Sequence, residues 1–206
     1  MVKDNIVADP IEFFFDFSSP YGYIAAHRIE EIAKKHRREV LWKPFLLGAI
    51  FKVNEQRPLK DQALKWDYSS HDLDRLARLY GIAWQLPDPF PIPTQAAGRV
   101  FYWISDQDTR LAKKFALLVY QEYFSKGIDI RPKEVITELA VGLGLDENTS
   151  LSAIDDDIYK IKLKDVTSEA INRNVCGSPF FFIGNEPFWG SDRLDMIDTW
   201  LGTGGW

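Results

Sequence analysis

The chain has one cysteine among its 206 residues, so Cys176 can form neither an intrachain disulfide nor a Cys-x-x-Cys redox pair. Its three histidines lie far apart without the spacing of metal ligands, which argues against a zinc site. No apolar stretch approaches the roughly 18 residues that span a bilayer. The first ten residues contain charged side chains and a proline, unlike a signal peptide. We therefore expect a soluble, cytoplasmic protein without a bound metal ion.

The chain has fewer basic than acidic residues. Lys and Arg total 25 against 30 Asp and Glu, which gives a formal net charge of −5. Such a balance disfavours binding to nucleic acid or to an anionic membrane surface. The one dense basic run, residues 34–38, closes a predicted helix, where positive charge complements the helix dipole. The run is therefore interpreted as structural.

The amino-terminal segment has the pattern of a strand–helix–strand unit. Residues 11–17 are almost entirely apolar, as in a central strand that is buried on both faces. From Pro20 to about residue 36 the apolar residues recur at helical spacing, and residues 39–45 have the pattern of a second strand. A unit of this kind joins its strands by a right-handed crossover.

The middle of the chain is predicted to be mainly helical. Residues 54–70 are polar and irregular, and the alternating prolines of 87–93 favour an extended segment. Helices are expected over 72–81, from 94 to about 127 with an interruption at 106–108, within 131–144, and over 151–175.

The carboxyl-terminal segment returns to β structure. Residues 178–190 have the pattern of two strands around a Gly184-Asn185 turn, and a final helix follows from about Asp192. Two β-rich ends around a helical middle predict an α/β, thioredoxin-like fold with a large all-helical insertion. The predicted thioredoxin-like domain is discontinuous and comprises residues 1–46 and 166–206, and residues 47–165 form the helical insertion domain.

Ser19 stands between the first predicted strand and the helix that starts at Pro20. A serine before a proline is a common helix cap, so the position is explained by structure alone. It also lies at the carboxyl end of a central strand, where open α/β sheets bind their ligands. In the thioredoxin fold this helix begins with Cys-x-x-Cys, and here the four residues are Ser19-Pro20-Tyr21-Gly22. Dithiol exchange is thus excluded, but the site could bind a sulfur from another molecule.

Several stretches resemble a known family: "FDFSSPYGYIA", "KPFLLGAIFK", "WDY…DLDRLARLYGI" and "FFIGNEPFWGSDRLDMI". They are similar to the 2-hydroxychromene-2-carboxylate isomerases, which are glutathione-dependent enzymes of bacterial aromatic hydrocarbon catabolism. That family has the thioredoxin fold and is related to the kappa-class glutathione transferases and to bacterial disulfide oxidoreductases of the DsbA type. The resemblance covers nearly the whole chain, and its motifs "DFSSPY" and "FWGSDRLD" are specific together and weak apart.

The resemblance implies roles for particular residues. Ser19 would donate a hydrogen bond to the glutathione sulfur, Ser178 would pair with the backbone of the tripeptide, and Pro179 would follow a cis peptide bond. Lys52 would contact an acidic substrate. The residues expected to hold the γ-glutamyl end are Trp189, Gly190, Ser191 and Asp192.

Other interpretations of these residues stay open. Lys52 could be a solvated surface lysine, and Asp192 could be the cap of the final helix. Phe90 and Trp84 are candidates for a flat apolar slot, although both fit a plain core role as well. Cys176 is interpreted as a buried structural thiol, with a side reaction such as glutathionylation as the alternative.

The activity that this resemblance implies is glutathione-dependent isomerisation. A free glutathione thiol has a pKa of about 8.5, and a helix terminus plus a serine hydroxyl would lower it by roughly 1–3 units. The thiolate would add to 2-hydroxychromene-2-carboxylate or to a trans-o-hydroxybenzylidenepyruvate-type keto acid and leave after bond rotation. The alternatives are a kappa-like glutathione transferase that conjugates small electrophiles, and a non-catalytic thioredoxin-like binding module. A homodimer would follow from the relatives, not from the residues themselves.

The chain departs from the family pattern in three places. Residues 53–62 are poorer in glycine and asparagine than expected, Pro93 stands where an asparagine is frequent, and Phe90 stands where a tyrosine is expected. All three lie in the predicted insertion, on the substrate side. The sequence therefore supports the use of glutathione better than it supports a particular second substrate.

Overall fold

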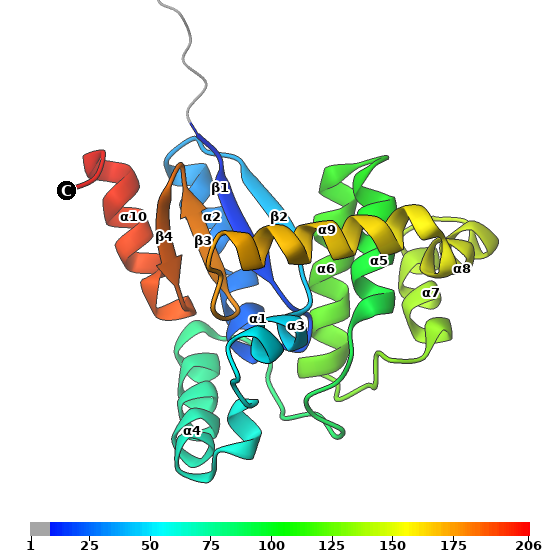
Figure 1. The fold of residues 1–206 in the computed structure, drawn as a ribbon, viewed down its shortest axis with the longest axis horizontal. Helices are drawn as coiled ribbons and strands as arrows, with labels where there is room; N and C mark the ends of the chain where they lie inside the picture. The colour runs from blue at the N-terminus through cyan, green and yellow to red at the C-terminus, as the bar shows by residue number, and fades with distance from the viewer. Residues whose placement is uncertain (1–8) are drawn as a thin grey trace, which may run out of the picture.

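The computed structural model describes residues 9–206, so most of the segment on which the signal-peptide prediction rests lies outside the described residues. Its centre is a mixed four-stranded sheet with the strand order β2-β1-β3-β4 (Figure 1). β1 is parallel to β2 and antiparallel to β3, and β4 is antiparallel to β3. This topology confirms the predicted thioredoxin-like fold. The strands are β1 (Ile11–Phe15), β2 (Val40–Pro44), β3 (Phe180–Ile183) and β4 (Glu186–Trp189).

The central strand β1 is apolar on both sides because each face of the sheet is covered. Phe13 stacks on Phe181 with 5.1 Å between ring centroids, in the larger core. Phe14 points to the other face, where its ring meets Phe45 and Phe182 in a second core. An alternating pattern would have left one of these faces polar, so the continuous run of phenylalanines fits a doubly covered strand.

The predicted helix after β1 is in fact two helices, α1 (Pro20–Ala26) and α2 (Ile29–Lys35). The chain turns at His27 and Arg28, and the Arg28 guanidinium there bonds Tyr80 Oη at 2.9 Å and Asp195 Oδ1 at 2.6 Å. These bonds tie the break to two other helices, which the periodicity of residues 20–36 could not indicate. The final helix, α10 (Leu194–Thr203), lies beside β4 at the edge of the sheet (Figure 1).

Between β2 and β3 all the regular elements of the described chain are helices. The prediction of irregular structure over 54–70 was wrong from Ala63 onward, because α4 begins there, and α3, which lies between β2 and this stretch, was not predicted. The interruption at 106–108 is confirmed. The helical stretch 151–175 comprises parts of two helices, because Asp156 separates them and its carboxylate accepts the Ile158 N–H. The elements are α3 (Leu47–Val53), η1 (Leu59–Asp61), α4 (Ala63–Tyr80), α5 (Gln95–Ser105), α6 (Thr109–Phe124), α7 (Lys133–Gly142), α8 (Glu147–Asp155) and α9 (Asp157–Asn172).

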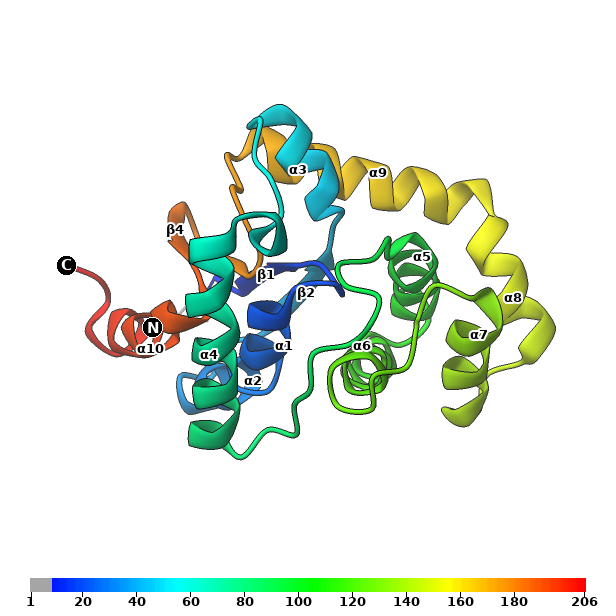
Figure 2. The ribbon, with the colours of Figure 1, turned by 90° about the horizontal axis from the view of Figure 1, so that it is seen from below.

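Helices from the segment between β2 and β3 lie on both sides of α1. Figure 2 shows α4 on one side of α1 and the group α5–α8 on the other, with α3 near the end of β2. The predicted domain boundary at 165/166 falls inside α9, which runs from the α5–α8 group across one face of the sheet (Figure 1), and this division stays a prediction.

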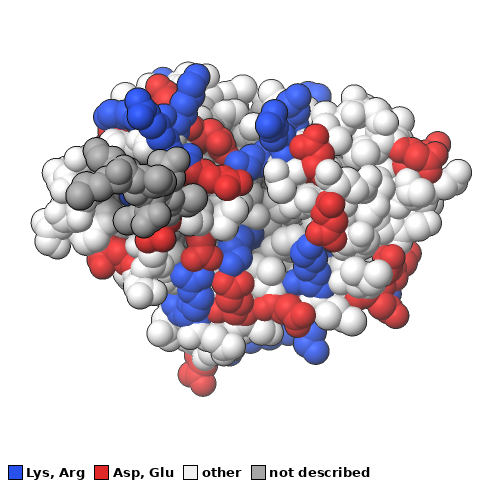
Figure 3. All heavy atoms as spheres, turned by 90° about the horizontal axis from the view of Figure 1, so that it is seen from above, with Lys and Arg blue, Asp and Glu red and all other residues white. Residues whose placement is uncertain are grey.

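The described surface carries charges of both signs. On the face seen in Figure 3, Lys and Arg side chains lie beside Asp and Glu, and neither sign covers the face alone. None of the helices in residues 9–206 has the length and apolar character needed to cross a bilayer.

Candidate functional site

A cavity of about 1340 Å³ opens at the edge of the sheet where β1, β2 and β4 end and β3 begins. Helices α1, α3 and α4 lie at the same edge (Figure 1). The cavity brings together residues that are far apart in the sequence and includes every predicted site residue, whose individual roles stay predictions. Those residues are Ser19, Lys52, Phe90, Ser178, Pro179, Trp189, Gly190, Ser191 and Asp192.

Ser19 is both the cap of α1 and part of the cavity wall, so the two interpretations of this residue do not exclude each other. Its Oγ accepts the Gly22 N–H at 3.1 Å and donates to the Ser178 carbonyl at 2.8 Å. Only 4% of the residue is exposed. Pro20 occupies the first helical position and has no N–H, whereas the Tyr21 N–H belongs to a first turn without intrahelical acceptors. The Ser19 hydroxyl, whose one proton goes to the Ser178 carbonyl, therefore lies next to the Tyr21 N–H, which has no acceptor within the helix.

The two adjacent serines have different partners. The Ser18 Oγ accepts the Ile92 N–H at 3.0 Å, which fixes the proline-rich segment against the end of β1. Ser19 instead faces α1 and Ser178. Of the pair, only Ser19 bonds the elements on which a thiolate site is predicted.

Asp16 is a site residue that the sequence analysis missed. Its carboxylate is 5% exposed and accepts three hydrogen bonds, from Ser18 N at 2.8 Å, Leu47 N at 2.8 Å and Thr94 Oγ1 at 3.0 Å. Burial raises the pKa of this carboxyl, and the three donors act against the rise. Leu47 begins α3 and Thr94 precedes α5. One carboxylate thus joins the end of β1 to two segments of the insertion that line the cavity. An acidic residue directly after a buried strand was the available signal.

The segment before β3 forms the opposite rim. The Ser178–Pro179 peptide bond is cis, as the resemblance implied. The Ser178 Oγ accepts the Asp16 N–H at 3.0 Å, and the Pro179 carbonyl accepts the Gly190 N–H at 3.0 Å. The rim is thus bonded both to β1 and to the end of β4.

Two positions near this rim require glycine, one because of a close contact and the other because of its backbone conformation. A Cβ on Gly177 would lie 2.3 Å from the Trp189 Nε1, so the indole ring covers the Gly177 backbone. Gly190 has a φ of 110°, a conformation that residues with a side chain rarely adopt. The Trp189 ring is held over the rim by this close approach and is still 56% exposed.

Asp192 does not cap the final helix, so that interpretation was wrong. A short η2 turn, Ser191–Arg193, precedes α10, and neither element has a side-chain cap. Asp192 lies inside the turn, where its carboxylate contacts Arg193 Nη1 at 3.1 Å. Asp192 lines the cavity, so its predicted contact with the γ-glutamyl end of glutathione stays a proposal.

An aromatic wall faces Ser19 from the insertion. Phe90 stacks on Trp66 with 5.5 Å between centroids and 27° between planes, and both residues line the cavity. The segment that carries Phe90 has cis bonds before Pro89 and Pro91, which the sequence analysis did not predict. Lys60 Nζ donates to the Phe90 carbonyl at 2.8 Å.

Trp84, the other slot candidate, is not part of this wall. It stacks on Phe124 with 5.3 Å between centroids and donates to Asp74 Oδ1 at 2.8 Å. It is partly buried and packs against the larger core. Trp66 takes the place that the sequence analysis offered to Trp84, because α4 extends further toward its amino-terminal end than predicted.

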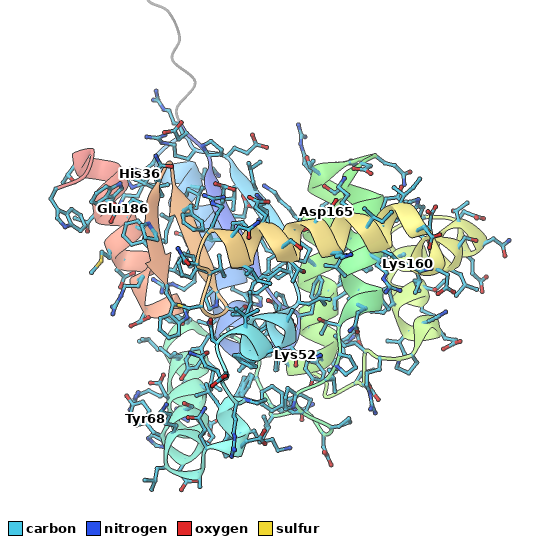
Figure 4. The ribbon with its side chains drawn as sticks, viewed as in Figure 1. His36, Lys52, Tyr68, Lys160, Asp165 and Glu186 are labelled. Atoms are coloured by element: carbon cyan, nitrogen blue, oxygen red, sulfur yellow. The ribbon has the colours of Figure 1, made fainter. Side chains whose placement is uncertain are left out.

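The side of the cavity that the insertion forms, the insertion wall, carries cations. Lys52 lies on α3 (Figure 4) and is exposed, as are Arg57 and Lys65, which line the same cavity. Within residues 9–206 none of the three forms an ion pair, although Glu55 and Asp72 are also part of the wall. An anionic group that reached this wall would meet three cations that are not already engaged in ion pairs with described residues.

Comparison with known proteins gives the family. The model of the DSBA-like thioredoxin domain matches residues 10–202. The chain belongs to this family. It is 27% identical to the 2-hydroxychromene-2-carboxylate isomerase of Pseudomonas putida, with 93% of this chain and 94% of the relative covered. It is 27% identical to glutathione S-transferase kappa 1 of Caenorhabditis elegans, with 91% and 88% covered. A solved structure of 2-hydroxychromene-2-carboxylate isomerase matches with a TM-score of 0.84, 26% identity and 94% coverage of both chains.

In this DSBA-like thioredoxin domain the cysteine lies near the site. Cys176 lines the cavity and is half-buried, so it is less enclosed than the sequence analysis proposed. Burial raises the pKa of the Cys176 thiol, which lowers the thiolate fraction at neutral pH.

The histidines do not contribute to the cavity of this DSBA-like domain. His36 lies at the other end of the sheet from Lys52 (Figure 4), next to Asp198. Partial burial lowers the pKa of His27, which lies at the turn between α1 and α2 and is exposed to solvent. In the part of the chain that the structure describes, no three His, Cys, Asp or Glu side chains are grouped to hold a metal ion.

Proposed function

We propose that this protein is a glutathione-dependent isomerase for 2-hydroxychromene-2-carboxylate and the related trans-o-hydroxybenzylidenepyruvate-type aromatic keto acids. The observation on which the proposal rests is the Ser19 hydroxyl, which stands at the start of α1 inside a large cavity and bonds the carbonyl before a cis-proline. The relatives named as isomerases are similar over nearly the whole chain, which supports the same reaction class.

The residues at the thioredoxin-like side of the cavity fit glutathione. A thiolate needs hydrogen-bond donors, and Ser19 Oγ–H and the Tyr21 N–H are both at the start of α1. An extended tripeptide needs backbone partners and charges of both signs, which the 177–179 rim and the Asp192–Arg193 pair provide. The volume of about 1340 Å³ is larger than the ~300–1000 Å³ of an ordinary ligand pocket, which supports room for two ligands.

Ser19 has a single proton, which it now donates to the Ser178 carbonyl. Binding a thiolate would exchange a neutral hydrogen bond, about 0.5–1.5 kcal/mol, for a charged one of about 1.5–3 kcal/mol. The exchange favours the thiolate by about 1–2 kcal/mol, which lowers the pKa of a bound thiol by roughly one unit. Because α1 has only seven residues, we expect its dipole to add a value at the low end of the usual range. The total is smaller than the upper limit expected from sequence.

When bound, glutathione would supply a nucleophilic thiolate that adds reversibly to the electrophilic carbon, which permits rotation about the former double bond. The protein residues would do the rest. Ser19 would hold the sulfur in its ionised form, and the stacked Phe90 and Trp66 rings would orient a flat aromatic substrate. Lys52 would attract the carboxylate of the substrate toward α3.

A kappa-like glutathione transferase is the second candidate, favoured by the similarity to glutathione S-transferase kappa 1. The two activities share the thiolate and differ in the fate of the sulfur. A transferase leaves glutathione bonded to the product, whereas an isomerase returns it unchanged. Chromatography of a reaction with stoichiometric glutathione separates them, since only the transferase accumulates a conjugate.

The test of the proposal is glutathione binding and activity in a Ser19→Ala variant. We expect the pKa of the bound thiol, followed by thiolate absorbance, to rise by about one unit, and the isomerisation rate at neutral pH to fall by roughly 10–100-fold. Glutathione affinity should fall less, because the rim residues remain.

The matched control is Ser18→Ala, which removes the neighbouring hydroxyl from the Ile92 N–H and should leave the pKa of the bound thiol unchanged. If calorimetry detected no binding of glutathione to the native protein, the proposal would be wrong. If glutathione bound but Ser19→Ala had full activity, the thiolate role of Ser19 would be wrong. If glutathione bound and the native protein neither isomerised nor conjugated an electrophile, a non-catalytic binding module would be the better description.

A further inference from the structure

Gly22 occupies the position where the second cysteine of a Cys-x-x-Cys motif would stand. It lies in the first turn of α1, and its backbone is helical. A glycine in a helix is less favourable than an alanine, so its presence here needs a reason other than backbone conformation. The reason is steric, because a Cβ at this position would lie 2.6 Å from the Tyr120 hydroxyl oxygen, well inside van der Waals contact.

Tyr120 cannot easily move away. It belongs to α6, is fully buried, and donates from its hydroxyl to the Asp16 carbonyl at 3.0 Å. Burial raises the pKa of its phenol well above the usual value, so the hydroxyl stays protonated. Its ring is enclosed by four other aromatic rings at centroid distances of 5.3–6.2 Å, namely Phe15, Phe17, Tyr23 and Phe124.

The Tyr120 hydroxyl therefore fills the space next to Ser19. The same hypothetical Cβ on Gly22 would be 3.2 Å from the Ser19 Cβ and 3.3 Å from the Ser178 Oγ, so the position borders the proposed sulfur site directly. We propose that Tyr120 is a specificity-determining residue that excludes a second thiol from this site and so restricts it to the chemistry of one externally supplied sulfur. The inference goes beyond the proposed function, because it holds whichever electrophile the protein uses.

The proposal predicts the result of restoring a dithiol. Ser19→Cys with Gly22→Cys would give thiols at both positions, and oxidised glutathione is the oxidant. The thiolate at position 19 attacks one glutathione sulfur, forms a mixed disulfide and releases one glutathione thiolate. The thiolate at position 22 then attacks the sulfur at position 19, forms the internal disulfide and releases the second glutathione. Two protein thiols lose two electrons to the oxidised glutathione, and their two protons end on the released thiols.

With Tyr120 present we expect this sequence to stop at the mixed disulfide, because the side chain at position 22 cannot take its helical place. Adding Tyr120→Phe removes the obstructing oxygen, and the Asp16 carbonyl keeps the Ser19 N–H as a donor. Relief of overpacking should increase the internal disulfide by about tenfold or more. All variants carry Cys176→Ala, since Cys176 lines the same cavity. Intact mass distinguishes a glutathionyl adduct from the loss of two hydrogens.

A second measurement applies if the double-cysteine variant fails to fold. Gly22→Ala should lower the thermal midpoint in the native background and leave it unchanged or raise it in the Tyr120→Phe background. The matched control is Tyr123→Phe, which removes another buried hydroxyl from α6, bonded to the Pro89 carbonyl at 2.8 Å, and should not rescue Gly22→Ala.

Rescue by Tyr120→Phe alone, in either measurement, supports the proposal. Two results would overturn it: an internal disulfide that forms equally well with Tyr120 present, or a Gly22→Ala destabilisation that is the same in both backgrounds. Neither result depends on glutathione being the natural cofactor, so the proposed function is tested separately.

Discussion

The two walls of the cavity are built in different ways. On the thioredoxin-like wall, Ser19 and Asp16 are 4% and 5% exposed, and their side chains are bonded to neighbouring strands and helices. On the insertion wall, Lys52, Arg57 and Lys65 are exposed and form no ion pairs within residues 9–206. One wall is part of the bonding that holds the sheet to its helices, and the other extends into solvent.

Helix α4, which forms part of the insertion wall, is attached to the thioredoxin-like part of the fold through side chains. Tyr21 Oη donates to Asp72 Oδ2 at 3.1 Å, and burial raises the pKa of Tyr21 to about 12, which keeps this donor protonated. Two further polar connections of α4 are Arg28, which donates to the Tyr80 hydroxyl at 2.9 Å, and Trp84, which donates to Asp74 Oδ1 at 2.8 Å. A wall held mainly by such side-chain contacts can change its residues without disturbing the sheet. The fold therefore determines where a sulfur would bind far more firmly than which electrophile would meet it.

Asp16 is the residue that joins the two walls, and Asp16→Asn should have the largest effect. Asparagine has the same shape as aspartate. Its amide nitrogen, however, would face at least one of the three groups that now donate hydrogen bonds to the carboxylate. A buried donor without an acceptor costs about 1–3 kcal/mol. We expect the free energy of unfolding to fall by this amount near pH 4, and the KM values for glutathione and electrophile to rise together, as measured by urea unfolding and steady-state kinetics. A change in only one KM would contradict the joining role.

The pH dependence of this difference has a definite sign. Burial raises the pKa of Asp16 in the folded protein above its ordinary value of 3.8. Between the unfolded and folded pKa values the native state binds more protons, so the stability contributed by Asp16 is present at acid pH and declines as the pH rises. The stability difference between native protein and Asp16→Asn should shrink from pH 4 to pH 7. A difference that grows with pH would mean that the three donors lower the pKa.

The sequence predicted the thioredoxin-like wall well because short-range chemistry determines it. Strand residues 11–15, the Ser19-Pro20 helix start and the two strands after Pro179 all have local patterns, and the structure has each of them. Asp16 was missed because nothing near it in sequence indicates Leu47 and Thr94 as donors. Its importance depends on contacts that only the folded chain brings together.

The insertion wall was predicted less well, also for physical reasons. The start of α4 at Ala63 has no side-chain cap, so the signal for its beginning was absent. Trp84 and Trp66 are equally aromatic in sequence, and only the direction of α4 places Trp66 on Phe90 while Trp84 lies on Phe124. Residues whose position depends on how helices cross cannot be assigned from periodicity alone.

Trp66→Leu tests the insertion wall alone. The stacked pair with Phe90 would be lost, and an aromatic pair contributes about 0.5–1.5 kcal/mol beyond its buried area. We expect the KM for the aromatic electrophile to rise about 2–10-fold while the dissociation constant of glutathione is unchanged. Trp84→Leu is the matched control, since its ring is outside the cavity and should affect only stability. Equal effects of the two variants on KM would show that the wall is not a substrate surface.

Lys52→Gln should have the smallest effect, because an exposed cation and a carboxylate attract each other by about 0.2–1 kcal/mol. We expect the KM for an acidic electrophile to rise about 1.5–5-fold at low ionic strength. Added salt should raise the KM of the native protein and should raise that of the variant less, because screening weakens the same attraction. Lys160→Gln makes the same change in net charge on α9, away from Lys52 (Figure 4), and should keep the native salt dependence. If both variants lost that dependence, the net charge of the protein, not Lys52, would be attracting the substrate.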